Sequence, residues 1–397
     1  INRDGEGTVT SVVSADGQVT DIGIDADKNL YRTGYENNSE FRFYYDKSLL
    51  QEKVDRNGKS FKHYFDENGR VYQTTDPEGG RWNFFDETLS YNQNRYGLTT
   101  AEGETYETIR TILMTGDVEK VTTSKDGSQV TSIMQADDLK ETILSNGVST
   151  VIDKVVDSKT LDEIPQVITV TQPSGLVSST VINKVYGENG ADTSKHTVTM
   201  LSNGRESSVV TESKLGTVIA RSPEGRTVSY YSDPATLLLG RVSTSGLLDT
   251  TYLYDDRGRT THITTGDRTT EYVYDDANPK VRGNVESIIA ADGQVTRFEY
   301  DELDRIEKTT YHDGHSTATT YDKNGNAETL LVPTQVTHSF TANGVNKVET
   351  NTTPLNEVTR YRYDKDRRLQ EIELPSGQLI TNTYISGQLR KTTTVEG

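Results

Sequence analysis

The stretch YLYDDRGRTTHITT (residues 252–265) carries the pattern that decides the fold. Tyrosines stand two residues apart at 252 and 254, the four residues Asp255 to Gly258 read Asp-x-x-Gly, and a Thr-rich segment follows. An Asp at the first position of a type I turn accepts a hydrogen bond from the amide two residues later, and Gly takes a positive φ at no steric cost. The stretch therefore predicts a β-hairpin with a short turn.

The same unit recurs with a period of about 20 residues, which indicates a repeat architecture. The hexapeptide ADGQVT occurs at 15–20 and again at 291–296, and in both copies an Asp stands eight residues after the Gly. This fixed spacing predicts a strand of about 20 Å between two turns. The repeated turns are Asp66–Gly69, Asp255–Gly258 and Asp322–Gly325, and the aromatic series is Tyr45, Phe65, Phe85, Tyr254, Tyr274, Tyr300, Tyr321, Tyr363 and Tyr384.

Because side chains alternate between the two faces of a strand, one aromatic ring of each unit should lie beside the ring of the next unit. We therefore expect the aromatic series to form a ladder of stacked rings along a long antiparallel sheet. Three zones follow from the regularity of the pattern. Residues 1–99 and 241–397 carry Tyr-Asp hairpins, and 100–240 keeps only the Gly turns, with longer Val/Ile/Thr-rich strands of the same sheet.

Composition narrows the possible functions. Hydrophobic residues make up 32% of the 397, which is a low fraction for a compact globular protein. The 22 Tyr residues suit a surface that is partly packed and partly exposed to solvent. The net charge of −18 argues against binding to nucleic acid, and no apolar run is long enough to span a bilayer. The absence of Cys excludes disulfides and thiolate metal sites. The first residue is Ile1 and not Met, so we expect a piece of a longer protein.

The hairpins resemble the RHS/YD-repeat family, through YLYDDRGRTTHITT, FEYDELDRIEKTT (298–310) and YRYDKDRRLQEIELPSG (361–377). The stretch VPTQVTHSFTANGVNKVETNTTP (332–354) is similar to an element of bacterial RHS proteins. The family includes bacterial polymorphic toxins, cocoon-forming subunits of insecticidal toxin complexes, and animal teneurins. The resemblance implies strands that spiral into a hollow shell, which in the bacterial toxins encloses a C-terminal toxin domain. Because the sequence shows no self-cleavage segment or divergent toxin tail, the resemblance implies only the shell.

Two groups of residues raise the question of a metal site. Asp25, Asp27, Asn29 and Glu36 occupy positions 1, 3, 5 and 12 of a calcium loop, but Leu30 stands where that loop needs Gly. We keep calcium as an open alternative and otherwise expect no cofactor. His312 and His315 flank a Gly turn without an evident third ligand, and a solvated turn is the simpler interpretation.

Three functions stay open from the sequence alone. The first is a non-enzymatic shell segment, whose partners are other segments of its own chain or an enclosed toxin, and for which we expect no catalytic residues. The second is an extracellular carbohydrate-binding adhesion module, with Trp82 and His63 as glycan-contact candidates. For the protein as a whole we expect a secreted or cell-surface location and a bacterial origin. The third is an enzyme acting on a polysaccharide, since carboxylates are abundant. We favour the shell because turn-forming Asp residues repeat with the unit, whereas catalytic residues have no reason to be periodic.

Overall fold

The computed structural model describes residues 1–187, 192–278, 280–385 and 387–395. Within these residues the chain forms 36 strands of one sheet and a single 3-10 turn, η1 (Ser213–Leu215). Each strand pairs antiparallel with the strands before and after it in the sequence. This meander confirms the all-β class of antiparallel repeat hairpins. None of the described residues belongs to a helix that is long and apolar enough to cross a membrane.

The strands divide among the three zones of the sequence. In the first zone they are β1 (Asn2–Arg3), β2 (Val9–Val13), β3 (Val19–Ile24), β4 (Leu30–Tyr35), β5 (Glu40–Asp46), β6 (Leu49–Val54), β7 (Ser60–Phe65), β8 (Val71–Thr75), β9 (Arg81–Ser90) and β10 (Gln93–Thr99). In the second they are β11 (Thr105–Ile112), β12 (Val118–Thr123), β13 (Gln129–Met134), β14 (Lys140–Ser145), β15 (Val148–Val156), β16 (Glu163–Thr171), β17 (Val177–Tyr186), β18 (Lys195–Ser202), β19 (Arg205–Glu212), β20 (Thr217–Arg221), β21 (Thr227–Ser232) and β22 (Leu239–Thr244). In the third they are β23 (Thr250–Tyr254), β24 (Thr260–Thr265), β25 (Arg268–Val273), β26 (Ser287–Ile289), β27 (Val295–Tyr300), β28 (Ile306–Thr310), β29 (Ser316–Tyr321), β30 (Ala327–Leu331), β31 (Thr337–Ala342), β32 (Val348–Thr352), β33 (Val358–Tyr363), β34 (Leu369–Glu373), β35 (Leu379–Ile385) and β36 (Gln388–Val395).

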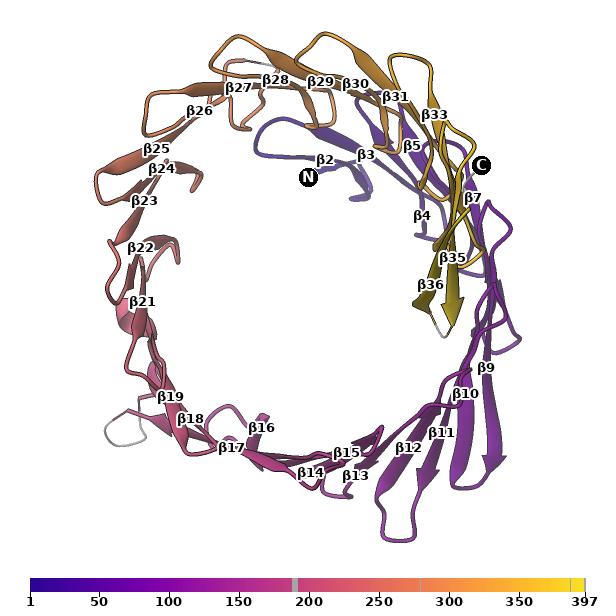
Figure 1. The fold of residues 1–397 in the computed structure, drawn as a ribbon, viewed down its shortest axis with the longest axis vertical. Helices are drawn as coiled ribbons and strands as arrows, with labels where there is room; N and C mark the ends of the chain where they lie inside the picture. The colour runs from indigo at the N-terminus through magenta and orange to yellow at the C-terminus, as the bar shows by residue number, and fades with distance from the viewer. Residues whose placement is uncertain (188–191, 279, 386, 396–397) are drawn as a thin grey trace.

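The strip of strands curves into a ring, and none of the described strands crosses its centre (Figure 1). The chain passes more than once around this ring, because the last strands, β26 to β36, reach the part of the circle that the first strands already occupy (Figure 1). The strip has two turn-bearing edges. We call edge A the one formed by turns that follow even-numbered strands, and edge B the one formed by turns that follow odd-numbered strands.

The Asp turns of edge B form as their sequence predicts. Oδ1 of Asp255 accepts hydrogen bonds from the amides of Arg257 at 3.0 Å and Arg259 at 2.9 Å, and Gly258 has a φ of 79°. Just before this turn the register of β23 and β24 shifts between Leu253 and Tyr254, which marks a β-bulge. The same shift precedes the turns that start at Asp301, Asp322 and Asp364. Because a bulge bends and twists its strand, its repetition along edge B contributes to the curvature of the strip.

Three predicted hairpin turns differ in the structure. Asp86 lies inside β9, so Phe85 and Asp86 do not end a strand; no Gly follows them, and the chain turns only after Ser90. β5 continues through Asp46, and the turn after Tyr45 is made by Lys47 and Ser48, both at positive φ. After Tyr274 no short hairpin forms, since β26 begins only at Ser287.

The sheet has almost no hydrophobic core. Among the described residues Val281 is the one hydrophobic side chain that is fully buried. Cross-strand threonine pairs are bonded instead, for example Thr264 with Thr269 at 3.0 Å and Thr320 with Thr329 at 2.7 Å. Such pairs each contribute about 0.2–1 kcal/mol, so stability is spread along the strip rather than concentrated in a centre. The middle zone has longer strands, of 8 to 10 residues from β15 to β19.

Candidate functional site

The most distinctive site is the seam where the chain meets its own beginning. Edge A of the hairpins between β2 and β13 contacts edge B of the hairpins between β23 and β36. The bonded residues are 241 to 291 positions apart in the sequence. Because different edges meet, the contact is made by turns and side chains and not by strand pairing.

The third residue of the edge A turns makes a regular set of these contacts. Asp16 accepts a hydrogen bond from Arg257 at 2.7 Å, and Asn57 donates to Asp322 at 2.7 Å. The next two turns use carboxylates that accept from backbone amides: Glu78 from Gly344 at 2.6 Å and Glu102 from Lys365 at 2.8 Å. The seam therefore repeats with the hairpins, and each unit of edge A has a counterpart on edge B.

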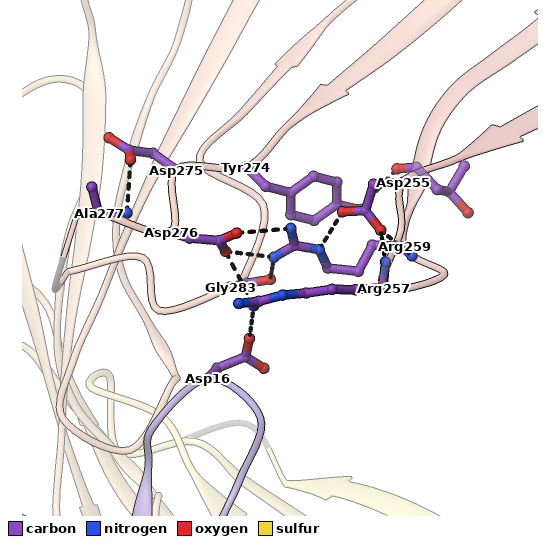
Figure 2. Close-up of polar contacts among 10 residues, drawn as sticks. Asp16, Asp255, Arg257, Arg259, Tyr274, Asp275, Asp276, Ala277 and Gly283 are labelled. Carbon is purple, nitrogen blue, oxygen red and sulfur yellow. Dashed lines mark hydrogen bonds and ion pairs between the residues drawn. The ribbon is translucent and has the colours of Figure 1, made fainter.

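Figure 2 shows how the seam begins at the turn after β23. Arg259 lies between two carboxylates, with Nε 2.7 Å from Asp255 and Nη1 2.8 Å from Asp276, and its guanidinium stands over the ring of Tyr274 (Figure 2). Arg257 leaves the same turn to reach Asp16 (Figure 2). Burial opposes ionisation of Asp255, but the amide and guanidinium of Arg259 outweigh it and hold the pKa of that carboxyl below its ordinary value.

Arg368 binds carboxylates from both edges of the seam. Its Nε donates to Asp364 at 2.7 Å, while Nη1 reaches Glu104 at 3.2 Å and Nη2 reaches Asp366 at 3.4 Å. These three carboxylates are 5%, 5% and 9% exposed. Burial works against the charge of Arg368, yet the bond to Asp364 and the neighbouring carboxylates raise the pKa of its guanidinium. Glu104 lies on edge A and the other two on edge B, so one cation holds both edges.

A second buried acid of edge A, Asp76, is held in the same way. Nε of Arg367 donates to Oδ2 of Asp76 at 3.0 Å, and the Asp76 side chain is 1% exposed. The guanidinium of Arg367 also stands 4.8 Å from the ring centroid of Trp82. Trp82, one of the two glycan-contact candidates, therefore has a cation from the seam on its ring. Its role in glycan contact stays a prediction.

The tyrosines of the aromatic series are linked by hydroxyl groups and arginines. The Tyr300 hydroxyl donates to the Val285 carbonyl at 2.9 Å, a residue 15 positions earlier. Direct ring contacts among the described residues involve other pairs, such as Phe41 with Phe43. Side-chain hydroxyls with the same type of bond are those of Tyr254, Tyr274, Tyr321, Tyr363 and Tyr384. The expected ladder of stacked rings is therefore a ladder of hydroxyl-to-carbonyl bonds, because each ring leans over the backbone of the preceding hairpin.

The calcium-loop residues are not brought together. Asp25 starts the turn between β3 and β4, and its Oδ1 accepts from the amides of Asp27 and Asn29. Glu36 follows β4 at the opposite edge, where its carboxylate accepts from the Val19 amide at 3.0 Å and pairs with Arg282. No group of three or more His, Asp or Glu that could hold a metal is found in the part of the chain that the structure describes.

The histidines noted in the sequence have ordinary surroundings. Nδ1 of His315 lies 3.0 Å from Asp313, within the edge A turn that also contains His312. His63 is half-buried on β7, and burial, with help from Lys53, lowers the pKa of its imidazole. His63 pairs with Thr74 of β8.

Sequence reasoning missed two features of the site. The first is the arginine at the fifth position of the Asp turn, visible in the sequence as Arg259, Arg305 and Arg368, each four residues after an Asp. The second is a cluster in the middle zone, where the 2% exposed carboxylate of Asp157 accepts from Lys184 at 2.7 Å and Tyr186 at 2.6 Å. These two donors hold the pKa of Asp157 far below its ordinary value, so the cluster is a fixed ion pair.

The chain is similar to a known protein family and to solved structures. A family model described as "Teneurin YD-shell" matches residues 1–397. No curated protein matches the sequence. The Tc holotoxin pore of Photorhabdus luminescens is 11% identical, with a TM-score of 0.44, over 98% of this chain and 26% of that one. The crystal structure of TcdB2-TccC3 without its hypervariable C-terminal region is also 11% identical, with a TM-score of 0.44, over 95% of this chain and 26% of that one. This chain thus spans about a quarter of the length of those structures.

Proposed function

The chain belongs to the teneurin YD-shell family, and from that premise we propose that it is a wall segment of a hollow β-shell that encloses or presents a polypeptide. The wall is one sheet thick and has almost no core, as expected of a container with solvent on both faces. Its role is structural and non-enzymatic. Its partners are further segments of its own longer chain or an enclosed toxin polypeptide, and the whole protein is secreted or displayed at the cell surface.

The seam is the observation that carries this proposal. A single-layer sheet has two free turn edges, and a container requires that these edges join as the strip coils. The charges on the two edges are complementary: edge A contributes Asp16, Asp76 and Glu104, and edge B contributes the arginines that bind them. Complementary charges fix the register of one edge against the other, which a wall needs if it is to close without gaps.

Electron microscopy of the purified chain tests the architecture. The proposal expects a ring with an open centre, and a compact globule without a centre would overturn it. Limited proteolysis of the full-length protein tests the function. A segment enclosed by the shell should resist protease in the native protein and become sensitive when Arg368→Met loosens the seam. Equal sensitivity in both proteins would contradict enclosure while leaving the architecture intact.

The two other functions from the sequence stay predictions. A carbohydrate-binding module would have to use rings other than the face of Trp82 that Arg367 covers. Binding on a broad glycan array would favour that module, and release of product from a polysaccharide would favour an enzyme.

A further inference from the structure

Three turns on edge B share one arrangement. The Asp that begins the turn bonds the Arg four residues later, and this guanidinium stands over the Tyr about 20 residues after the Asp. Nε lies 2.6–2.7 Å from Oδ2 of the Asp, and the guanidinium lies 4.3–4.9 Å from the ring centroid. The three groups are Asp255, Arg259 and Tyr274; Asp301, Arg305 and Tyr321; and Asp364, Arg368 and Tyr384.

The turn between β3 and β4 has the same acid and the same ring but no arginine. Asp25 begins this turn, Asn29 stands at the fifth position, and Tyr45 is 20 residues after the Asp. Asn29 is too short to reach the ring, and its amide makes only a long contact of 3.3 Å to Oδ2 of Asp25. A cavity of about 610 Å³ lies beside this turn, and all three residues line it. Tyr31 and Tyr44, 47% and 48% exposed, form further aromatic walls.

A second cavity shows that a missing arginine alone does not make such a site. The turn that begins at Asp322 also has an Asn at its fifth position, Asn326, and a cavity of about 850 Å³ is found beside it. There, however, Oδ2 of Asp322 already accepts from Asn326 and Asn57, both at 2.7 Å. The position of the ring is taken by Ala342. The cavity at Asp25 differs in two ways: it has Tyr45 at the position that Ala342 takes in the second cavity, and Oδ2 of Asp25 accepts one long contact where Oδ2 of Asp322 accepts two short hydrogen bonds.

We propose that the cavity at Asp25, Asn29 and Tyr45 binds the guanidinium of an arginine side chain presented by a second polypeptide. The bound group would occupy the position that the chain's own arginines fill in the three complete groups. A guanidinium suits this place because it is planar, stacks on a ring and donates two parallel hydrogen bonds to a carboxylate.

The other charges of the cavity are compatible with a cationic guest. Arg32 and Arg42 both bond to the Glu40 carboxylate, which offsets part of their charge. Burial raises the pKa of Tyr45, and the charge of Asp25 raises it further, so the field of that carboxylate reaches the ring. Lys47 is an exposed cation at the rim, and it should compete with the guest.

The location leaves this cavity accessible while the ring is closed. The hairpins of β3 to β6 use their edge A in the seam, through Glu36 and Asn57. The cavity lies on their edge B, between the turn that begins at Asp25 and the turn at Lys47 and Ser48. A bound polypeptide would therefore contact the edge opposite the seam and would leave the seam contacts of these hairpins in place.

The test is an NMR titration of the protein with N-acetyl-arginine amide, with N-acetyl-citrulline amide as the uncharged isostere. We expect saturable shifts of the amides of residues 25–31 and 43–48 with the arginine probe, and at least tenfold weaker binding of the citrulline probe. Asn29→Arg should supply the missing guanidinium, weaken binding at least tenfold and raise the melting temperature. Lys47→Ala should tighten binding.

Two variants complete the design. Asp25→Asn keeps a turn-forming residue, as Asn343 does at the start of its own turn, and should weaken binding at least tenfold. Asn326→Arg is the matched control, because it makes the same change in the second cavity and should leave binding unchanged. Equal binding of the two probes, or full binding by Asn29→Arg, would overturn the proposal. Equal binding of N-acetyl-lysine amide would overturn the preference for a guanidinium.

Discussion

Replacing Arg368 by Met should open the seam locally. The Met side chain keeps much of the length of Arg but removes a charge that faces the nearly buried carboxylates of Asp364, Glu104 and Asp366. Removing one partner of a buried ion pair costs about 3–5 kcal/mol, and a wall with water on both faces places the cost at the lower end, about 3 kcal/mol. Arg362→Met is the control, since Arg362 is 53% exposed and pairs with Glu371 on the surface. It should lose only about 0.2–1 kcal/mol.

Urea unfolding measures the loss of stability, and hydrogen exchange locates it. In Arg368→Met the amides of residues 100–104 should exchange faster, although they are about 264 positions away in the sequence. The double variant Arg368→Met with Glu104→Gln should lose less stability than the sum of the losses of the two single variants. The reason is that Glu104→Gln removes a carboxylate that Arg368→Met leaves without its cation. A loss below about 1 kcal/mol, or unchanged exchange at 100–104, would refute the view that Arg368 joins the two edges.

Three further predictions test the hairpins. Tyr300→Phe removes the hydroxyl that bonds the Val285 carbonyl and should cost about 1 kcal/mol in urea unfolding; no loss would contradict the hydroxyl ladder. Gly97→Ala places a Cβ 2.0 Å from the Tyr106 carbonyl oxygen, so β10 and β11 should separate and the melting temperature should fall; an unchanged value would contradict this packing. Burial opposes ionisation of Asp322, but its amide hydrogen bonds hold its pKa below the ordinary value, so its carboxylate stabilises the fold above about pH 4 and loses this contribution as the pH falls. Asp322→Asn should flatten the acid limb of the stability curve, and an unchanged limb would be evidence against it.

The hairpins could be predicted from the sequence because their signals are local. The turn at Asp255 needs only a carboxylate and a Gly at fixed offsets, and its observed bonds are those the pattern predicts. Phe85 and Asp86 show the limit of this reasoning. The aromatic-Asp pair is present, but the positive-φ residue that completes the turn is not, so β9 continues.

The seam could not be predicted, for a physical reason. The position of Arg257 relative to Asp16 depends on small bends accumulated over more than twenty strands, and no local pattern encodes that sum. The acidic residues of edge A and the basic residues of edge B are visible in the sequence, but their pairing becomes clear only once the curvature is known. The stacking of Arg259 on Tyr274 could not be predicted for a simpler reason. Periodic tyrosines predict contacts between rings, and they carry no signal for a contact between a ring and an arginine.

The most direct test of closure uses the absence of Cys in this chain. Lys59 on edge A and Lys323 on edge B both line the cavity at the seam, and both are exposed. Spin labels on Lys59→Cys and Lys323→Cys should give one short, narrow distance distribution in pulsed electron paramagnetic resonance. Lys59 directly precedes β7 and Lys195 begins β18, and these two strands lie on opposite sides of the ring, so a label pair at Lys59 and Lys195 should give a long distance (Figure 1). A long or broad distribution for the Lys59 and Lys323 pair would contradict the closed ring.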